Sequence, residues 1–258
     1  MAGQMDDPRQ RTGQGARPPA RGALREVEEV RRMFARIVGR YDMMNRLMTG
    51  GRDVVWRREA ARRALGADAG DGRALDVATG TGDLALALAE AGARFVVGLD
   101  FVTPMVRAAS VKARAHPGTA FVVGDALCLP FADGQFDACT VAFGLRNMAD
   151  YEAALREMVR VLRPGGRFVC LELTPFRRPV LGRLFRWYFT QLVPLVGGIL
   201  SGDQEAYRYL PRSVTAFPAA DALAGLMRQT GLTDVSYRLL GGGAVALHVG
   251  TKATLRSD

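Results

Sequence analysis

Lysine, cysteine and histidine are scarce in this chain of 258 residues. The only lysines are Lys112 and Lys252, so arginine supplies nearly all of the basic charge, which exceeds the acidic charge by 9. Three cysteines, Cys128, Cys139 and Cys170, form no C-x-x-C pair and have no histidine nearby. This spacing excludes a zinc motif and a disulfide framework, and it predicts reduced core residues and no metal site.

Long apolar runs are also missing. The longest uncharged, largely apolar run, 187–202, is shorter than the ~20 residues that a spanning helix needs, and it contains Pro194. The start of the chain lacks the apolar stretch of a secretory signal. With 48% apolar and 24% charged residues, the composition is that of a globular protein, which we expect to be cytoplasmic. Scattered arginines without a dense run argue against nucleic-acid binding.

The first residues differ in composition from the rest of the chain. Residues 1–23 are rich in proline, glycine and arginine and have almost no large apolar side chains, which predicts a disordered tail. Residues 24–258 are expected to form a single domain. Within it, helical spacing predicts N-terminal helices over 24–72 and an inserted helical cap over 175–212.

Short apolar runs alternate with helical patterns in the middle of the chain. Strands are predicted at 74–78, 95–100, 120–124, 136–142 and 167–172, followed by a hairpin of strands at 234–240 and 244–252. Helices are predicted at 82–92, 103–115, 150–162 and 219–230, with Asp150 as an N-cap and Pro104 in a first turn. This alternation predicts an α/β fold with a mostly parallel seven-stranded sheet, helices on both faces and an antiparallel C-terminal hairpin strand.

A glycine loop follows the first predicted strand. Residues 78–85 match the dinucleotide pattern G-x-G-x-x-G/A, and Asp100 follows Gly80 by 20 residues. Asp83 falls in the first turn of the next helix, where it would repel a pyrophosphate, and Asp76 adds a second negative charge beneath the loop. Both acids favour S-adenosylmethionine over NAD, because this nucleoside carries a sulphonium and an ammonium group and no phosphate.

Acidic residues also end the neighbouring strands. Asp100 can accept hydrogen bonds from ribose hydroxyls, and Asp125, after the third predicted strand, is placed to meet the adenine amino group. Gly80 and Gly82 allow the backbone to approach a ligand closely. Because ligands of open α/β sheets bind outside the carboxyl ends of the strands, we expect these residues to share one cofactor site.

Four segments of the chain carry a resemblance to a known family. They are 41–45 (Tyr-Asp-Met-Met-Asn) with Trp56, 75–84 across the glycine loop, 143–147 (Phe-Gly-Leu-Arg-Asn) with 160–166, and 206–213. On these residues the chain resembles, from about 27 to 251, the ubiquinone/menaquinone biosynthesis C-methyltransferases. The resemblance implies a Rossmann-like class I methyltransferase fold and S-adenosylmethionine as cofactor. The chain departs from the family pattern at Thr49, Gly50 and Asp53, where serine, an aromatic residue and histidine are more usual.

The resemblance also implies where the two substrates bind. Cofactor contacts are expected at Asp76, Gly80, Thr81, Gly82, Asp100, Phe101, Asp125, Ala126 and Ala142. Catalytic roles are implied for Arg146, Asn147, Asp125 and Tyr41, and a substrate pocket for Met44, Tyr207 and Tyr209. Because arginine is effectively always protonated, we expect Arg146 to polarise a water or to pair with a forming phenolate rather than to take the proton.

The implied reaction is C-methylation of a prenylated quinol ring, demethylmenaquinol to menaquinol. Ubiquinone precursors, a soluble natural-product acceptor and, more distantly, an NAD-dependent oxidoreductase stay open as alternatives. The pattern over 176–192 places apolar side chains on one helix face and arginines on the other, which fits an internal cap helix and also a helix at an anionic membrane surface. Contact with the inner face of the cytoplasmic membrane and a homodimer are left open at this point.

Overall fold

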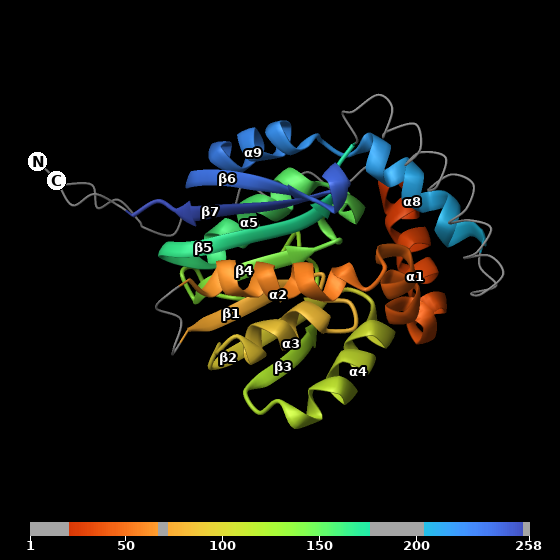
Figure 1. The fold of residues 1–258 in the computed structure, drawn as a ribbon, viewed down its shortest axis with the longest axis horizontal. Coiled ribbons are helices and arrows are strands. Elements are labelled where there is room, and N and C mark those ends of the chain that lie inside the picture. Colours follow the sequence, from red (N-terminus) through yellow and green to blue (C-terminus); the bar gives the residue numbers. More distant parts are fainter. Residues whose placement is uncertain (1–20, 67–71, 176–203, 255–258) are drawn as a thin grey trace, which may run out of the picture.

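The computed structural model describes residues 21–66, 72–175 and 204–254, and within them seven strands form one sheet (Figure 1). The strand order is β3-β2-β1-β4-β5-β7-β6. The parallel strands are β1 (Arg73–Val77), β2 (Phe95–Asp100), β3 (Thr119–Val123), β4 (Phe136–Ala142) and β5 (Leu162–Leu173). β7 (Val245–Lys252) is antiparallel to β5 and to β6 (Leu232–Leu240). The predicted fold class is confirmed.

The predicted start of β5 is five residues too late, and the predicted end of the preceding helix, α5 (Tyr151–Val161), is one residue too late. We expected a helix that Pro164 stops and a strand that begins at 167. The helix ends earlier because Leu162 takes an extended conformation and pairs with Phe136 of β4. Pairing with the sheet therefore ends the helix before the proline is reached.

Helices cover both faces of the sheet. α2 (Arg52–Leu65) and α3 (Asp83–Glu90) bury alanines and leucines against one face, and α5 and α9 (Ala220–Gln229) pack on the other. α4 (Thr103–Lys112) has Pro104 in its first turn, as expected, and packs along β2 and β3. The carboxylate of Asp150 caps α5, since it accepts a hydrogen bond from the Ala153 amide at 2.8 Å. These helices leave the carboxyl ends of the parallel strands available for a site.

α1 (Arg21–Thr49) and α8 (Gln204–Ala216) lie together beyond those carboxyl ends (Figure 1). Because α1 begins at Arg21, the predicted tail, 1–23, ends too late; residues 1–20 lie outside the described residues. Most of the predicted cap, 175–212, also lies outside them, and α8 continues past the predicted end of the cap. α1 lies over the carboxyl ends of the parallel strands, and ligands of this fold class bind at those ends.

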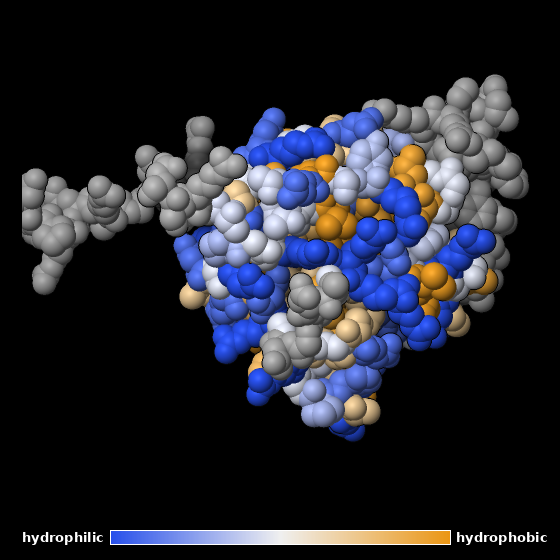
Figure 2. Space-filling model, turned by 60° about the vertical axis from the view of Figure 1, so that its left-hand side comes forward, coloured by the Kyte–Doolittle hydropathy of each residue, from blue (hydrophilic) through white to orange (hydrophobic). Residues whose placement is uncertain are grey.

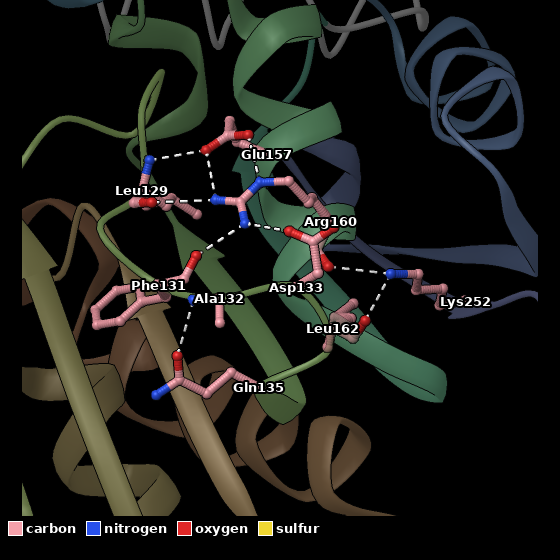
Figure 3. Close-up of polar contacts among 9 residues, drawn as sticks. All are labelled: Leu129, Phe131, Ala132, Asp133, Gln135, Glu157, Arg160, Leu162 and Lys252. Atoms are coloured by element: carbon pink, nitrogen blue, oxygen red, sulfur yellow. Dashed lines mark hydrogen bonds and ion pairs between the residues drawn. The ribbon is translucent and has the colours of Figure 1, made fainter. Parts of the chain in front are cut away.

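Arg160 belongs to a segment that resembles the family, and its role in the fold is structural (Figure 3). Its guanidinium donates to the carbonyl oxygens of Leu129 and Phe131 and pairs with the carboxylate of Glu157. The ammonium group of Lys252 donates to the carbonyl oxygen of Arg160 itself at 3.1 Å. This network fastens the loop before β4 to α5 and to β7.

One of the three cysteines that we expected in the core lies on the surface. Cys139 and Cys170 are buried, but Cys128 is exposed because it lies in a turn after β3, so the prediction of a core residue is wrong there. The face drawn in Figure 2 is mainly hydrophilic. In the three described ranges, no helix is long and apolar enough to cross a membrane, and no group of three His, Cys, Asp or Glu side chains could hold a metal ion.

Candidate active site

The carboxyl ends of β1 to β4 open into a cavity of about 1010 Å³, counting its open mouth, which we call the strand-end cavity. Six of the cofactor contacts expected from the sequence line it: Gly80, Asp100, Phe101, Asp125, Ala126 and Ala142. Tyr41 and Asn147, for which the resemblance implies catalytic roles, line it as well. No lysine or arginine is among the described residues that line it. The cavity therefore lacks the cations that would pair with a pyrophosphate.

Asp100 links the glycine loop to the end of β2. Its Oδ2 accepts a hydrogen bond from the Gly80 amide at 2.8 Å, and its Oδ1 accepts one from the Val102 amide at 2.9 Å. Burial raises the pKa of Asp100, and backbone hydrogen bonds from Val102, Gly80 and Phe101 oppose that rise. Each carboxylate oxygen has further lone pairs, so Asp100 can hold the loop and still accept hydrogen bonds from a ligand.

Asp76 lies under the loop, as expected, but it does not line the strand-end cavity. Its carboxylate accepts hydrogen bonds from the hydroxyls of Thr79, at 2.7 Å, and Thr140, at 2.8 Å. Thr140 is near because it is the partner of Asp76 in the parallel register of β1 and β4. Burial raises the pKa of Asp76 to about 6, and the two hydroxyls oppose that rise. Asp76 thus supports the loop from below rather than reaching a ligand.

Asp83 and Thr81 fasten α1 to the loop instead of lining the cavity. The Lys112 ammonium pairs with Asp83 at 2.7 Å and also with Asp42 of α1. The Thr81 hydroxyl donates to the other oxygen of Asp42 at 2.5 Å. Lys112 pairs with two carboxylates, so the cluster keeps a net negative charge, and the repulsion of a pyrophosphate by Asp83 stays a prediction. The absence of lysine and arginine from the described walls of the strand-end cavity points the same way.

The two glycines of the loop, Gly80 and Gly82, have different roles. Gly80 has a φ of 56°, and a Cβ there would meet nothing closer than the Tyr41 ring at 3.7 Å. A Cβ at Gly82 would come within 2.9 Å of the Phe121 ring and 3.0 Å of the Ala109 Cβ. Gly80 thus keeps the backbone open to the cavity, whereas Gly82 lets α3 pack closely against its neighbours.

Two residues that are not glycine hold a left-handed backbone where the loops after β1 and β4 meet. Ala78 has a φ of 53° and Phe143 a φ of 56°, and both line the strand-end cavity. A Cβ at Gly144 would lie 2.5 Å from the Cβ of Ala78, so the two loops are in close contact. Such conformations are costly for residues with a side chain and concentrate at functional sites.

A second cavity of about 860 Å³, counting its open mouth, lies between α1, α2 and the ends of β5 and β7, and we call it the α1 cavity. Apolar side chains form much of its wall: Met33, Phe34, Ile37, Met44, Met48, Phe143, Leu173 and Val245. Met44 and Tyr209, which the resemblance assigns to a substrate pocket, both line this cavity, whereas the side chain of Tyr207 lies outside the described part of α8. Phe34, Tyr41 and Phe143 line both cavities, so the cavities adjoin at these residues.

Arg146 enters the α1 cavity as half of a buried ion pair. Its Nη1 lies 2.5 Å from Oε1 of Glu172 and 2.6 Å from the carbonyl oxygen of Phe143. The side chains of Arg146 and Glu172 are 7% and 1% exposed. Among the described residues, neither Nε of Arg146 nor Oδ1 of Asn147, both buried, has a hydrogen-bond partner. Because Arg146 lines the α1 cavity and Asn147 the strand-end cavity, a molecule bound there can supply the missing partners.

A second buried ion pair in the same wall was missed by sequence reasoning. Nη1 of Arg57 lies 2.5 Å from Oδ2 of Asp53, with the two side chains 8% and 1% exposed. The Thr49 hydroxyl donates to Oδ1 of Asp53 at 2.9 Å. The spacing of four residues signals a helical ion pair, but an exposed pair has the same spacing. Glu172 was missed too, because nothing in its strand marks it as the partner of Arg146.

Tyr41 stands where the two cavities adjoin. Burial raises the pKa of its hydroxyl, while the guanidinium of Arg57, a hydrogen bond with Asn45 and the guanidinium of Arg146 oppose that rise. Tyr41 is therefore a neutral phenol at physiological pH. It can donate a hydrogen bond, but it is a poor proton acceptor.

The strand order, the antiparallel β7 and a strand-end cavity that suits a phosphate-free nucleoside define a class I methyltransferase that uses S-adenosylmethionine. The residues present fit this cofactor, since Asp100 offers acceptors, Gly80 gives access to the backbone and Asn147 has an unpartnered buried oxygen. The chain belongs to the ubiE/COQ5 methyltransferase family, whose model matches residues 23–252.

Relatives within this family are similar over most of their length. A demethylmenaquinone methyltransferase of Thermus thermophilus is 51% identical over 222 residues, which cover 85% of this chain and all of that protein. One of the same name from Roseiflexus castenholzii is 50% identical over 88% of this chain and 94% of its own. The ubiquinone/menaquinone biosynthesis C-methyltransferase UbiE of Geobacter sp. (strain M21) is 43% identical over 87% and 97%.

Solved structures share the fold at low identity. A SAM-dependent methyltransferase of Thermotoga maritima superposes with a TM-score of 0.61 at 21% identity, covering 86% of this chain and 98% of that one. The [4+2]-cyclase SpnF gives 0.65 at 18% identity, covering 88% and 96%. Since a cyclase shares the fold, the fold by itself does not assign a reaction.

Proposed function

We propose that the protein methylates a ring carbon of a prenylated quinol, with demethylmenaquinol as the acceptor. The observation that carries this proposal is the α1 cavity, which is apolar over much of its wall, contains a buried arginine and adjoins the strand-end cavity at Tyr41 and Phe143. The names of the relatives at 50% and 51% identity favour the menaquinone precursor. A ubiquinone precursor is the second candidate, because the name of the Geobacter relative includes both quinones.

The strand-end cavity holds the cofactor in this proposal. Asp100 takes the ribose hydroxyls and Asp125 the adenine amino group, and Phe101, Ala126 and Ala142 enclose the adenosine. Asp125 lines this cavity and not the α1 cavity, so we assign it to the cofactor and not to the acceptor ring. Asp76, Thr81 and Gly82 act through the shape of the loop. S-adenosylmethionine, when bound, supplies a methyl group that is electrophilic because it is attached to a sulphonium sulfur.

The residues of the α1 cavity prepare the ring carbon. A quinol carbon becomes nucleophilic when the neighbouring hydroxyl passes its proton to water, since the phenolate donates electrons into the ring. That carbon takes the methyl group as the bond from methyl to sulfur breaks, and its hydrogen then returns as a proton, through solvent, to the ring oxygen, which restores the aromatic quinol. Arg146, held by Glu172 and the Phe143 carbonyl, stabilises that phenolate with a fixed positive charge. Tyr41, which lines both cavities, donates a hydrogen bond to the ring oxygen, whereas Asn147 lines the strand-end cavity and faces the cofactor. With these groups already oriented, little reorganisation is needed when charge develops.

A prenyl tail needs an apolar surface to bind against. Met44 and Met48 line the α1 cavity, and flexible thioether side chains adapt to a chain of methylenes. On the outer side of the same helix, Met43 and Leu47 are 51% and 53% exposed. We include in the proposal a weak peripheral contact with an anionic membrane. The predicted interfacial helix, 176–192, lies outside the described residues, and the homodimer stays a prediction.

Labelled methyl transfer tests the proposed function. The purified protein is incubated with methyl-labelled S-adenosylmethionine and one of three acceptors: reduced demethylmenaquinone, a reduced polyprenyl benzoquinone precursor, or a tail-less dihydroxynaphthalene. We expect ring-carbon label to be transferred fastest to demethylmenaquinol. Fastest transfer to the benzoquinol would assign the ubiquinone precursor, and transfer to none of the three would contradict the proposal.

A further inference from the structure

We propose that Arg57 is a second anchor for the acceptor, binding the ring oxygen opposite the one that Arg146 stabilises, and that Asp53 is the positioning residue that holds it. This inference rests on the proposed function, because it assumes a ring with two oxygens in the α1 cavity. It assigns to Arg57 the selection of a 1,4-dihydroxy ring over a ring with one hydroxyl.

The cost of burying the second ion pair is the first reason. Arg57 and Asp53 are 8% and 1% exposed, almost the same as Arg146 and Glu172. A buried ion pair gains little stability over apolar residues of similar volume, since removing both charges from water costs as much as their attraction returns. Two such pairs in one apolar wall therefore need a reason beyond folding, and a polar ligand in the cavity supplies one.

The placement of the two guanidiniums is the second reason. The guanidinium of Arg57 lies over the Phe143 ring at 5.3 Å from its centroid, and Nη1 of Arg146 bonds the carbonyl oxygen of the same residue at 2.6 Å. Both guanidiniums also interact electrostatically with the Tyr41 hydroxyl. The two cations are thus grouped around Phe143 and Tyr41, where the α1 cavity meets the strand-end cavity.

The hydrogen bonds of Arg57 and Asp53 indicate different roles for the two residues. Both oxygens of Asp53 are engaged, one by Thr49 and the other by Arg57. Arg57 bonds only Asp53 among the described residues, and a guanidinium has five N–H donors. Arg57 therefore has donors to offer the cavity that it lines, whereas Asp53 is committed to fixing Arg57. This arrangement suits recognition of a hydroxyl oxygen.

The chemistry of a quinol provides a partner for each cation. One oxygen adjoins the carbon that is methylated, and it is the one that ionises. The opposite oxygen stays a hydroxyl and still needs a hydrogen-bond partner in a largely apolar cavity. A site built to bind a hydroxyl discriminates strongly against an analogue without it, because a buried polar group is then left unpaired.

A substrate-by-variant comparison tests the inference. The substrates are a prenylated 1,4-dihydroxynaphthalene and the matching naphthol that lacks the hydroxyl opposite the reacting side. We expect the wild type to prefer the diol in kcat/KM by roughly 100-fold, which corresponds to the cost of one buried polar group left unpaired. Arg57→Met should reduce that preference to below about 10-fold, with most of the loss on the diol. Arg58→Met is the matched control, since Arg58 is the next residue and its side chain is 62% exposed, and it should keep the full preference.

A second variant and a binding measurement complete the test. Asp53→Asn together with Arg57→Met removes both buried charges, so it tests the same preference if the single variant does not fold. Trp56 lines the α1 cavity, so its fluorescence in a Trp187→Phe background reports binding of both ligands without turnover. If neither ligand were turned over, the proposed function would be contradicted, and the binding measurement would still test the role of Arg57. An undiminished diol preference in the folded Arg57 variants, in turnover or in binding, would overturn the role of Arg57.

Discussion

The two cavities differ in how they are built. The strand-end cavity takes its polar groups from residues at or just after the ends of adjacent strands, such as Asp100 and Asp125, each held by nearby backbone amides. The α1 cavity takes Arg57 and Asp53 from one helix and Arg146 and Glu172 from segments 26 residues apart. The cofactor site thus follows from local chain geometry in this fold class, whereas the acceptor site depends on how a helix packs over the sheet.

The two sites also differ in whether their buried carboxylates are paired with a cation. Acids at the strand ends remain single charges that accept hydrogen bonds, and burial raises the pKa of Asp76 and Asp100. Beside the α1 cavity, the buried carboxylates of Asp53 and Glu172 each pair with a guanidinium. We therefore expect substitutions at the first site to weaken cofactor binding or to change the pH dependence of stability, and substitutions at the second to affect folding and turnover.

The largest effect is expected from Glu172→Ala. It leaves the buried guanidinium of Arg146 without its partner, so the free energy of unfolding should fall by about 3–5 kcal/mol. Urea unfolding measures the change. Glu157→Ala is the matched control, because Glu157 pairs with Arg160 in a partly exposed network (Figure 3). It should cost at most about 2 kcal/mol. Equal losses would mean that burial does not distinguish the two pairs.

Asp100→Ala is expected to weaken cofactor affinity by about 2–4 kcal/mol. The variant loses charge-assisted hydrogen bonds to the ribose and also the contact that holds the Gly80 amide. Calorimetry with S-adenosylmethionine and with its demethylated product measures the change. An unchanged dissociation constant would show that Asp100 does not contact the cofactor.

Arg146→Ala should lower turnover at least ~100-fold while leaving cofactor affinity nearly intact, as expected when a group that stabilises transition-state charge is lost. Single-turnover methyl transfer measures it. Combining it with Glu172→Gln removes the unpaired carboxylate, so this double variant controls for instability. Parallel loss of cofactor binding and activity in the double variant would mean that Arg146 supports the fold instead.

The smallest effect concerns Asp76→Asn and pH. The pKa of Asp76 is raised to about 6 in the folded protein from an ordinary value of 3.8. A carboxyl with a raised pKa stabilises the fold below its unfolded pKa, and this contribution is lost as the pH rises through the folded value. Relative to wild type, the variant should therefore gain about 2 kcal/mol in stability between about pH 4.5 and 7. Urea unfolding across that range measures it, and a pH-independent difference would mean that Asp76 titrates normally.

Much of the fold was predictable from sequence because strands and helices follow local apolar patterns. β2 and β4 have the predicted bounds, and Asp100, Asp125 and Ala142 line one cavity as expected. The sequence did not reveal that Asp83 pairs with Lys112, because the two residues are 29 apart and the pairing depends on how α3 and α4 pack. Arg57 and Glu172 were missed for the same reason: burial depends on the tertiary structure, and an ion-pair spacing does not reveal it.

The most direct test of two separate sites is a crossed binding measurement on Asp100→Ala and the Arg146→Ala, Glu172→Gln double variant. Calorimetry measures cofactor affinity, and Trp56 fluorescence in the Trp187→Phe background measures affinity for the prenylated diol. Asp100→Ala should lose cofactor affinity and keep diol affinity, whereas the double variant should show the reverse. If each variant lost both affinities to a similar extent, the two cavities would form a single site, and the division of labour described here would be contradicted.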